Sequence, residues 1–472
     1  MSGRTRIEKD SLGTRKVPRE AYYGVQTLRA KENFPVSGLR AHPALIRAYA
    51  AVKVACATAN RELGALKASI SRPVIKACEE VLAGRLDGQF VVDVYQAGAG
   101  TSLNMNVNEV VANRALELSG RPKGDYSAIH PNDHVNMSQS TNDSFPTATY
   151  VALLGQVREL LPVLRSLEKA FAAKGREFRA VVKSARTHLQ DAVPISLGQE
   201  FAAYAAALRA CRLELERRSR LLREVPLGGT AAGTGANTPP GFRRRAVRHL
   251  ARLTGLPLKP APDMRLGLQS HQPLAAVSSA LKELCLELIR VANDLRLLSS
   301  GPNTGLAEIR LPAAQPGSSI MPGKVNPSIL ECLNMVAFQI VARDLAVALC
   351  AQAGQMDLNV MMPLSAHNLL DSAQLLINFL PEVERRCVRE IRADAARCRD
   401  YRERSLSVAA LLNPLIGYAR AGELFREAQR RGVAVTRLVE ERGLLTRKEL
   451  DRLLDPHVWE RRAGARRTKR RR

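Results

Sequence analysis

The segment LLGQVRELLPVLRSLEKAF, residues 153–171, decides the fold class of this 472-residue chain. Its apolar residues recur at steps of three and four, which places them along one face of a helix. They are Leu153, Leu154, Val157, Leu160, Leu161, Leu164, Leu167 and Phe171. Pro162 interrupts the run, so we expect a bend there. The segment therefore predicts a long amphipathic helix in a mainly α-helical protein.

Two more segments extend this pattern. Apolar residues repeat at helical steps over residues 277–298, and residues 329–350 add small residues that allow neighbouring helices to approach closely. Helices this long, with apolar residues on more than one side, need several partners. Other subunits would supply them, and we find no fixed-period repeat that would indicate a monomeric helical array. We therefore expect a central long-helix bundle that other subunits extend.

The lengths of the expected helices and the frequency of turns change along the chain, and these changes indicate its domains. The first part is turn-rich, with helices expected at residues 50–63 and 74–82, and the last part consists of short helices. Thr446 and Glu449 form a capping-box pattern that predicts the start of the last helix. We expect an N-terminal mixed, mainly helical domain at 1–140, a central long-helix bundle at 141–395, a small C-terminal helical domain at 396–460 and a disordered basic tail at 461–472.

The formal net charge of +26 at pH 7 points first to a polyanionic partner. However, residues 460–472 alone hold eight Lys or Arg residues, and such runs are usually solvated ends. Aromatic residues make up only 4% of the chain, and no basic stretch is interleaved with them as a base-stacking surface requires. We therefore do not expect nucleic acid as a partner, and a tail that binds RNA or another polyanion is kept as an alternative.

Cysteine usage and the N-terminus indicate the compartment. The eight cysteines are scattered, without a C-x-x-C pair or a histidine at metal-ligand spacing, as in proteins of a reducing compartment. The N-terminal MSGRTRIEKDSLG is charged where a signal peptide is apolar, and no stretch reaches the uninterrupted length of a membrane span. We expect a cytoplasmic protein without a membrane partner.

Four polar segments interrupt the helical pattern. They are GAGTSLNMNVNE (98–109), HPNDHVNMSQSTNDSFPT (130–147), SARTHLQDAVP (184–194) and GSSIMPGKVNPS (317–328). Together they present hydroxyls, amides and a cation with few carboxylates, which is the lining expected for a small polyanionic substrate. They lack clustered His, Cys or carboxylate ligands, so we expect no metal site.

Each segment alone also has a simpler structural interpretation. A Ser-Thr-Asn cluster often only caps a helix, and residues 140–142 come just before the helical run that starts near residue 147. His188 alone is more often a structural histidine than a catalyst. The segment 317–324 is not a phosphate-binding P-loop, because Val325 follows the lysine.

The segment GSSIMPGKVNP (317–327) resembles the signature loop of the aspartase/fumarase superfamily. SQSTND (138–143) and RTHLQDA (186–192) occur in the expected order, and the likeness runs from RIEKDSLG to ERGLLTRKELD. This resemblance implies a mainly α, three-domain lyase without a cofactor. It also implies a homotetramer in which three subunits contribute to each active site.

Within the superfamily the sequence is most similar to aspartases. SQSTND with Thr141, NDLRLLSSGP and ERGLLT resemble that family, whereas HPND (130–133), LGGTAAGTG (227–235) and His367-Asn368 resemble class II fumarases. Three residues depart from the aspartase pattern, and the first two bear on the substrate more than on the chemistry. They are Asn303 and Met362, where an arginine and a glutamate are expected, and Met137, where many relatives have lysine.

The likeness implies anti elimination of ammonia from L-aspartate to give fumarate. The carboxylate that gathers negative charge, as an aci-carboxylate, would be held by Thr101, Ser140, Thr141 and Ser319. The other carboxylate would be held by Thr187, Lys324 and Asn326, and the amino group would face Asn142 and His188.

Ser318 is implied as the catalytic base. An ordinary serine is too weakly acidic for this role, so Lys324, a helix N-terminus and exclusion of water would have to activate it. Gly317 and Gly323 would let a mobile loop close over the substrate. Ser319 is chemically identical to Ser318, and only the resemblance chooses between them.

Three other functions remain open at this point. A class II fumarase would convert malate to fumarate and water. An amine lyase acting on a larger substituted succinate would fit the apolar Met362. A non-catalytic scaffold would use the basic tail to bind a polyanion.

Overall fold

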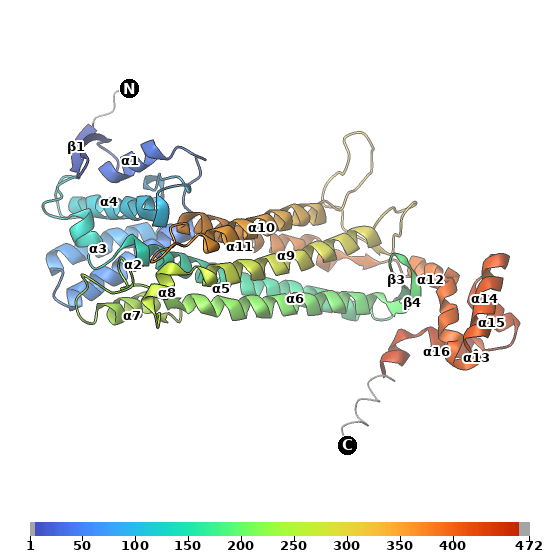
Figure 1. The fold of residues 1–472 in the computed structure, drawn as a ribbon. Coiled ribbons are helices and arrows are strands. Elements are labelled where there is room, and N and C mark those ends of the chain that lie inside the picture. The colour runs from blue at the N-terminus through green and yellow to red at the C-terminus, as the bar shows by residue number, and fades with distance from the viewer. Residues whose placement is uncertain (1–4, 462–472) are drawn as a thin grey trace, which may run out of the picture. The chain divides into compact units, whose positions relative to one another are not determined.

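The computed structural model describes residues 5–461, and these are mainly α-helical, as predicted (Figure 1). The expected basic tail lies outside these residues apart from Arg461. The chain forms two compact units, each assembled from three segments. Unit 1 consists of residues 1–162, 211–286 and 336–378, and unit 2 of residues 163–210, 287–335 and 379–472. The predicted division into three domains is not tested by these units and stays a prediction.

Unit 1 begins with a small hairpin. β1 (Thr5–Asp10) pairs antiparallel with β2 (Gly13–Pro18), and α1 (Val25–Asn33) follows. These elements lie beside α4 (Thr101–Leu118) in Figure 1. The buried Glu109 of α4 accepts hydrogen bonds from the backbone N–H groups of Gly24, Gln26 and Thr27 at 2.8–3.0 Å. Since α1 has no side-chain cap of its own, this carboxylate satisfies the free donors of its first turn.

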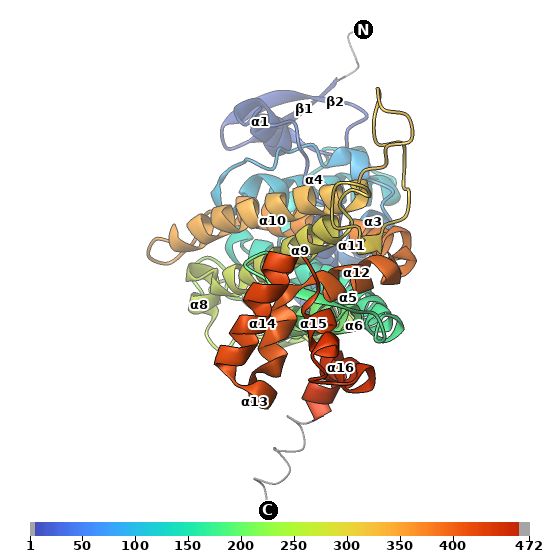
Figure 2. The same ribbon diagram turned by 90° about the vertical axis from the view of Figure 1, so that its right-hand side faces the viewer.

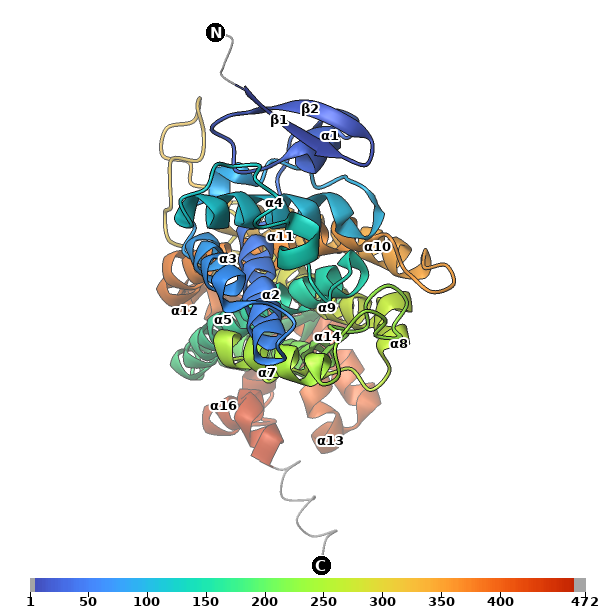
Figure 3. The ribbon, with the colours of Figure 1, turned by 90° about the vertical axis from the view of Figure 1, so that its left-hand side faces the viewer.

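Three further helices pack together in unit 1. α2 (Pro43–Glu62) lies between α3 (Ala68–Leu82) and α7 (Phe242–Thr254), as Figure 3 shows. The two helices expected from the sequence here are confirmed, and both begin earlier than predicted. For α2 the reason is a capped start, because Pro43 occupies the first turn and His42 Nδ1 accepts from the backbone N–H of Ala44.

Five long helices carry a large part of the apolar core. The apolar face predicted for residues 153–171, which belong to α5 (Thr141–Glu177), is confirmed. All its apolar side chains are buried except Leu161, which is half-buried. That helix continues through Pro162 without a break, and the boundary between the two units falls at this residue. The five are α5, α6 (Leu197–Ser219), α9 (Gln272–Leu298), α10 (Ser328–Gln352) and α11 (Met362–Arg386).

Polar contacts join these helices inside each unit. In unit 1, the hydroxyl group of Ser278 on α9 donates to Asp344 on α10 at 2.7 Å. In unit 2, the hydroxyl group of Tyr204 on α6 donates to Asp294 on α9 at 3.1 Å. Such buried bonds fix how neighbouring helices are aligned, which apolar packing alone leaves adaptable.

The outer side of α10 carries a stripe of exposed apolar side chains. Met335, Phe338, Leu345 and Leu349 are each more than half exposed. By length and composition this helix could span a membrane, although its apolar run is not uninterrupted, as expected from the sequence. Charged residues interrupt the helix at Glu331, Arg343 and Asp344, yet too sparsely to lower its mean hydropathy below that of a span. A core helix of a soluble protein passes the same test, so this is weak support for a membrane.

A group of short helices lies near the C-terminal end of unit 2 (Figure 2). Buried apolar residues between 409 and 450 form a core within this group. The helices are α12 (Ala395–Arg404), α13 (Asn413–Ile416), α14 (Tyr418–Arg431), α15 (Val435–Glu441) and α16 (Arg447–Leu454). The predicted capping box at the start of α16 is confirmed. The backbone N–H of Thr446 donates to Glu449 at 2.8 Å, and Thr446 Oγ1 accepts from the backbone N–H of Glu449 at 3.3 Å.

The remaining elements are short connections. Two of them form the hairpin that carries part of the candidate site, β3 (Val182–Thr187) and β4 (Gln190–Ser196). The others are α8 (Met264–Gln269), the parallel pair β5 (Glu224–Val225) and β6 (Lys259–Pro260), and the antiparallel pair β7 (Ile309–Arg310) and β8 (Arg392–Ala393).

Candidate active site

The residues predicted for the site fall into two groups, one in each unit. Unit 1 holds Thr101, Ser140, Thr141 and Asn142, and unit 2 holds Thr187, His188, Ser318, Ser319, Lys324 and Asn326. Each group has its own local architecture.

In unit 1 the starts of two helices meet. Gly100, with φ +83°, precedes α4, and a Cβ atom added there would lie 2.0 Å from the ring of Phe145 on α5. A side chain at this position would therefore force the two helices apart. The absence of a side chain lets Thr101 lie next to the first turns of α5.

α5 begins at Thr141, six residues before the start expected from the apolar pattern. Ser140 caps it, since its Oγ accepts from the backbone N–H of Asn142 at 3.2 Å. In return, Asp143 Oδ1 accepts from the backbone N–H of Ser140 at 3.0 Å. The simpler interpretation, that this cluster caps a helix, therefore holds for Ser140. Two adjacent helix N-termini also give this region a positive potential suited to an anion.

The hydroxyl group of Thr141 has a free proton. Its oxygen accepts from Asn104 Nδ2 at 2.9 Å, and within residues 5–461 its proton has no acceptor. Thr141 is 8% exposed, so the group is nearly buried without being fully satisfied. Asn142 Nδ2 in turn donates to the carbonyl oxygen of Ala231 at 2.8 Å. Thr141 is thus a donor available to a ligand.

A buried carboxylate anchors the start of α5. Asp143 is fully buried, and burial raises its pKa to about 6. Its Oδ2 accepts from the backbone N–H groups of Gly228 and Thr230 at 3.0 and 2.8 Å. The segment 227–235 is thereby held against the first turn of α5.

His130, one of the features similar to fumarases, caps a single helical turn. Its Nδ1 accepts from the backbone N–H groups of Asn132 and Asp133, both at 3.2 Å. In this arrangement Nδ1 is occupied by the chain itself and is not available to a substrate.

In unit 2, Thr187 and His188 lie at the tip of the β3–β4 hairpin. Thr187 pairs with Gln190, so His188 and Leu189 form a two-residue turn, and both have positive φ, 55° and 58°. Such values are uncommon for residues other than glycine and cost of order 1–3 kcal/mol each where they are held. His188 and Thr187 are exposed at this strained tip.

Ion pairs hold strand β3 of the same hairpin. Glu308, completely buried, lies 2.7 Å from Lys183 Nζ and 2.9 Å from Arg186 Nη1. Two cations on one strand therefore share one carboxylate. This anchor fixes the hairpin whose tip presents His188.

The segment 317–326 forms a loop before α10 that is closed at its base. The backbone N–H of Gly317 donates to the carbonyl oxygen of Lys324 at 2.8 Å, and Asn326 Nδ2 donates to the carbonyl oxygen of Gly317 at 2.6 Å. A Cβ atom at Gly317 would lie 2.6 Å from the nitrogen of Asn326, and Gly323 has φ +82°. Both glycines are therefore needed for this closed shape.

Ser318 receives two backbone donors inside this loop. Its Oγ accepts from the N–H groups of Ile320 and Met321 at 3.2 and 2.9 Å. Donors of this kind stabilise negative charge on an oxygen atom. Ser319 and Lys324 are exposed, and within residues 5–461 Lys324 has no carboxylate partner. No hydrogen bond or ion pair in that part of the chain joins the loop to the hairpin tip.

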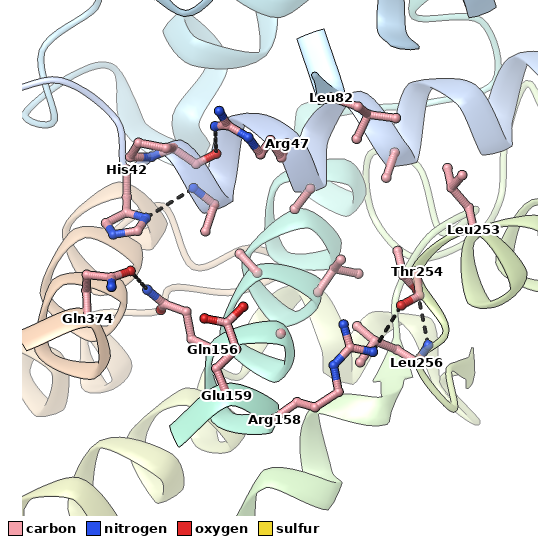
Figure 4. Close-up of a pocket in the computed structure, with 17 residues that line it drawn as sticks. His42, Arg47, Leu82, Gln156, Arg158, Glu159, Leu253, Thr254, Leu256 and Gln374 are labelled. Carbon is pink, nitrogen blue, oxygen red and sulfur yellow. Dashed lines mark hydrogen bonds between the residues drawn. The ribbon is translucent and has the colours of Figure 1, made fainter. Parts of the chain in front are cut away.

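Asn326 borders a small cavity of unit 2 together with Leu311 and Pro327. A cavity of about 640 Å³ in unit 1 lies near His42, Arg47, Gln156, Arg158 and Leu256 (Figure 4). None of the ten predicted site residues contributes to it. In the described part of the chain, no group of three or more His, Cys, Asp or Glu side chains is arranged to hold a metal ion.

Two of the residues that depart from the aspartase pattern have clear positions. Met362 is 1% exposed in the first turn of α11, so it serves as a core residue there. Asn303 is exposed in the loop after α9.

The structure also reveals a residue that the sequence did not single out. Lys53 of α2 is completely buried, and its Nζ donates to Asn104, Asn136 and Gln139. The available signal was one lysine inside the otherwise apolar stretch AAVKVACATA (50–59). A lysine flanked by small apolar residues on all helical faces is buried unless it reaches past them to water.

Comparisons with known proteins agree with this architecture. The family described as Lyase matches residues 13–342, and the family described as Fumarase C C-terminus matches residues 408–458. The chain is 46% identical over 457 residues to the aspartate ammonia-lyase of a Bacillus species, covering 97% of this chain and 98% of that protein. It is 45% identical to the fumarate hydratase class II of Thermosynechococcus vestitus, covering 96% of this chain and 97% of that protein.

A solved structure is similar throughout. The fumarate lyase:delta crystallin from Brucella melitensis, in a crystal structure bound to cobalt, superimposes with a TM-score of 0.92 at 49% identity. The likeness covers 96% of this chain and 99% of that one.

Proposed function

Because the chain belongs to the lyase family, we propose that it is an ammonia-lyase that converts L-aspartate reversibly to fumarate and ammonia. The observation that carries this proposal is the full-length identity of 46% to an aspartate ammonia-lyase. Thr141 within SQSTND also favours aspartate over malate as the substrate.

The difficult step of this reaction is removal of a proton from the carbon atom beside a carboxylate. The resulting aci-carboxylate concentrates negative charge on oxygens that are already charged. Donors held ready at those oxygens lower the barrier by roughly 3 kcal/mol each, by analogy with oxyanion holes. The free hydroxyl proton of Thr141 and the helix N-termini at Thr101 and Ser140 support a role for unit 1 in holding this carboxylate.

Ser318 is the proposed base. The hydrogen bonds that its oxygen accepts from two backbone N–H groups would stabilise an alkoxide. Lys324 would add a positive charge nearby once substrate is bound. Closure of the loop would carry Ser318 to the substrate and exclude water. Ser319 would be a further donor to the carboxylate that gathers negative charge. The second carboxylate would be held by Lys324, Asn326 and Thr187.

His188 and Asn142 are proposed to face the departing amino group. The positive φ of His188 supports this role, because strained residues are retained where the surrounding structure holds a side chain in a required orientation. The elimination needs no cofactor in this scheme, since proton transfer and charge stabilisation come from side chains and backbone groups.

We propose that the protein acts as a homotetramer with active sites shared between subunits, in the cytoplasm. The exposed apolar stripe on α10 supports the assembly, since Phe338, Leu345 and Leu349 would be removed from water in a core built by several copies. The eight cysteines are all free, which fits a reducing compartment.

The test is a side-by-side assay of purified protein with L-aspartate and L-malate, followed by the absorbance of fumarate. The proposal expects rapid release of fumarate from aspartate and little from malate. The opposite ratio would establish a class II fumarase, which the 45% identity to a fumarate hydratase makes the second candidate. No release from either substrate would favour a larger substituted succinate or a non-catalytic scaffold.

A further inference from the structure

Lys53 is a charged side chain without a charged partner. It is completely buried on α2, and no carboxylate of residues 5–461 lies within ion-pair distance of its Nζ. A buried ammonium group is costly unless all its donors are satisfied. Its three donors are matched by three amide oxygens, those of Asn104 at 2.8 Å, Asn136 at 2.9 Å and Gln139 at 3.0 Å.

This arrangement fits the charged form of the lysine. A neutral amine has two donors and one lone pair, so three facing oxygens would leave one of them opposed to that lone pair. Burial lowers the pKa of Lys53 to about 8, which still leaves the ammonium form dominant at pH 7. The protein therefore keeps a positive charge in its interior without a contacting carboxylate, and the buried Asp143 acts on this charge only through its electric field.

The charge is connected to the candidate carboxylate site by two hydrogen bonds. Lys53 Nζ donates to Asn104 Oδ1, and Asn104 Nδ2 donates to Thr141 Oγ1 at 2.9 Å. Because the oxygen of Thr141 is occupied by this donor, its own proton must point away from Asn104. Hydrogen bonds arranged in this way polarise one another, so a cation at one end strengthens the donor at the other.

We propose that the buried ammonium group of Lys53 strengthens dicarboxylate binding by polarising, through the Asn104 amide, the hydroxyl group of Thr141, and so acts as a positioning residue of the site. The inference rests on the proposed function only for the ligand, a small dicarboxylate. It adds a residue that touches neither the substrate nor the proposed base.

The other titratable groups around Lys53 do not change their charge near pH 8. Burial raises the pKa values of the Cys56 and Cys78 thiols and of the Tyr49 phenol, so these groups remain neutral near pH 8. Asp143, with a pKa raised to about 6, is already ionised there. Between pH 7 and 9, Lys53 is therefore the group of this cluster whose charge changes.

The first test measures the affinity of Lys53→Met for succinate, a dicarboxylate that cannot eliminate ammonia, by titration calorimetry at pH 7. We expect affinity to fall about tenfold, since one charge acting over a few bond lengths in the interior is worth that much. Turnover of aspartate should show a lowered kcat besides the weaker binding, because Thr141 is proposed to hold the carboxylate that gathers charge in the transition state. Circular dichroism and thermal unfolding verify that the variant is folded.

The pH profile separates polarisation from a merely structural role. The ammonium form is present below its pKa and lost above it, so wild-type affinity for succinate should weaken as pH rises through about 8. In Lys53→Met this dependence should disappear. Lys174→Met is the matched control, because Lys174 is also nearly buried but donates to the carbonyl oxygen of Ile391 in unit 2. It should keep both the affinity and the pH dependence of the wild type.

A second variant protects the test against misfolding of the first. Gln139→Glu places a carboxylate beside Lys53 Nζ and leaves the Asn104–Thr141 bond intact, so it should weaken succinate binding and move the pH dependence upward. Folded variants that bind succinate as the wild type does, or a Lys53→Met that keeps the alkaline loss, would overturn the inference. Failure of the wild type to act on aspartate would instead refute the proposed function, and the succinate titrations would still be interpretable.

Discussion

Ser318 and Ser319 have the same chemistry but different surroundings. The oxygen of Ser318 accepts two backbone N–H groups, whereas Ser319 is exposed and accepts none within the described residues. We therefore expect Ser318→Ala to lower kcat by roughly a thousandfold or more while substrate still binds, because a base acts only in the transition state. Ser319→Ala should instead weaken binding and keep measurable turnover. Steady-state kinetics with succinate as a competitive ligand measures both effects.

An exchanged pattern, with Ser319→Ala inactive and Ser318→Ala active, would assign the base to the neighbouring serine. Near-normal rates in both variants would refute a serine base on this loop.

His271 allows a residue-scale prediction about acid stability. It is 1% exposed before α9, neither ring nitrogen has a partner within residues 5–461, and burial lowers its pKa to about 4. Between pH 6.5 and 4 the unfolded chain therefore binds a proton that the folded chain does not. The free energy of unfolding should fall across this window by roughly 3 kcal/mol from this group alone. His271→Leu should remove that part of the slope.

Urea unfolding of wild type and variant at pH 7, 5.5 and 4.5 checks the sign. An equally steep loss of stability in the variant would show that other groups cause the acid sensitivity.

At the scale of elements, the meeting of α4 and α5 depends on one glycine. Gly100→Ala would place a Cβ atom against the Phe145 ring and force a side chain into positive φ. We expect it to destabilise the protein by roughly 2 kcal/mol or more and to weaken dicarboxylate binding, since the start of α4 must move. Thermal unfolding and a succinate titration measure the two effects.

Gly120→Ala is the matched control for this substitution. Gly120 also has positive φ, 71°, but a Cβ atom there would meet nothing within 4 Å. It should cost stability through the backbone alone and leave succinate affinity unchanged. Equal effects of the two variants on affinity would show that the close approach at Gly100 does not matter for the site.

The elements also show what periodicity can and cannot predict. The apolar faces of α5 and α9 could be read from the sequence, because their buried positions carry apolar residues at helical steps. The true start of α5 could not, since Asp143, Ser144 and Thr147 are fully buried yet polar. A pattern that equates polar with exposed misplaces such a turn, and buried polar residues concentrate where a site is built. Lys53 escaped notice for the same reason.

Roles for the four polar segments could be proposed only through likeness to a known family. Composition alone indicated a polyanion-binding lining, and nothing in it distinguished Ser318 from Ser319 or separated the residues into two units. That separation depends on contacts distant in sequence, such as those of Glu308 with Lys183 and Arg186.

At the scale of the whole molecule, the proposed lyase function assigns no role to the basic tail. Deletion of residues 464–472 should leave turnover of aspartate unchanged, because no predicted site residue lies near that end of the sequence. The check is a comparison of kcat and KM, together with retention on heparin at increasing salt. A deletion that lowers kcat would assign the tail a part in catalysis, and salt-dependent retention lost with the tail would support the polyanion-binding alternative.

The assembly can be tested through the exposed stripe on α10. Leu345 is 65% exposed, and Leu345→Glu should dissociate the proposed tetramer and abolish activity, since a charge would be buried in an apolar interface. Leu444→Glu, at a leucine that is 41% exposed in the C-terminal helices, is the control and should leave the assembly intact. Light scattering coupled to gel filtration gives the masses. An active, monomeric Leu345→Glu would refute the shared site.

Mixing two inactive variants tests whether subunits share each site. Thr141 and Ser318 belong to different units, and the proposed assembly takes them from different subunits. Thr141→Val and Ser318→Ala should each be nearly inactive alone. After the two are unfolded together and refolded in equal amounts, about a quarter of the sites should combine an intact Thr141 with an intact Ser318 and regain wild-type turnover. If both residues of a site came from one chain, every site would keep one defect. The mixture would then stay as inactive as its components.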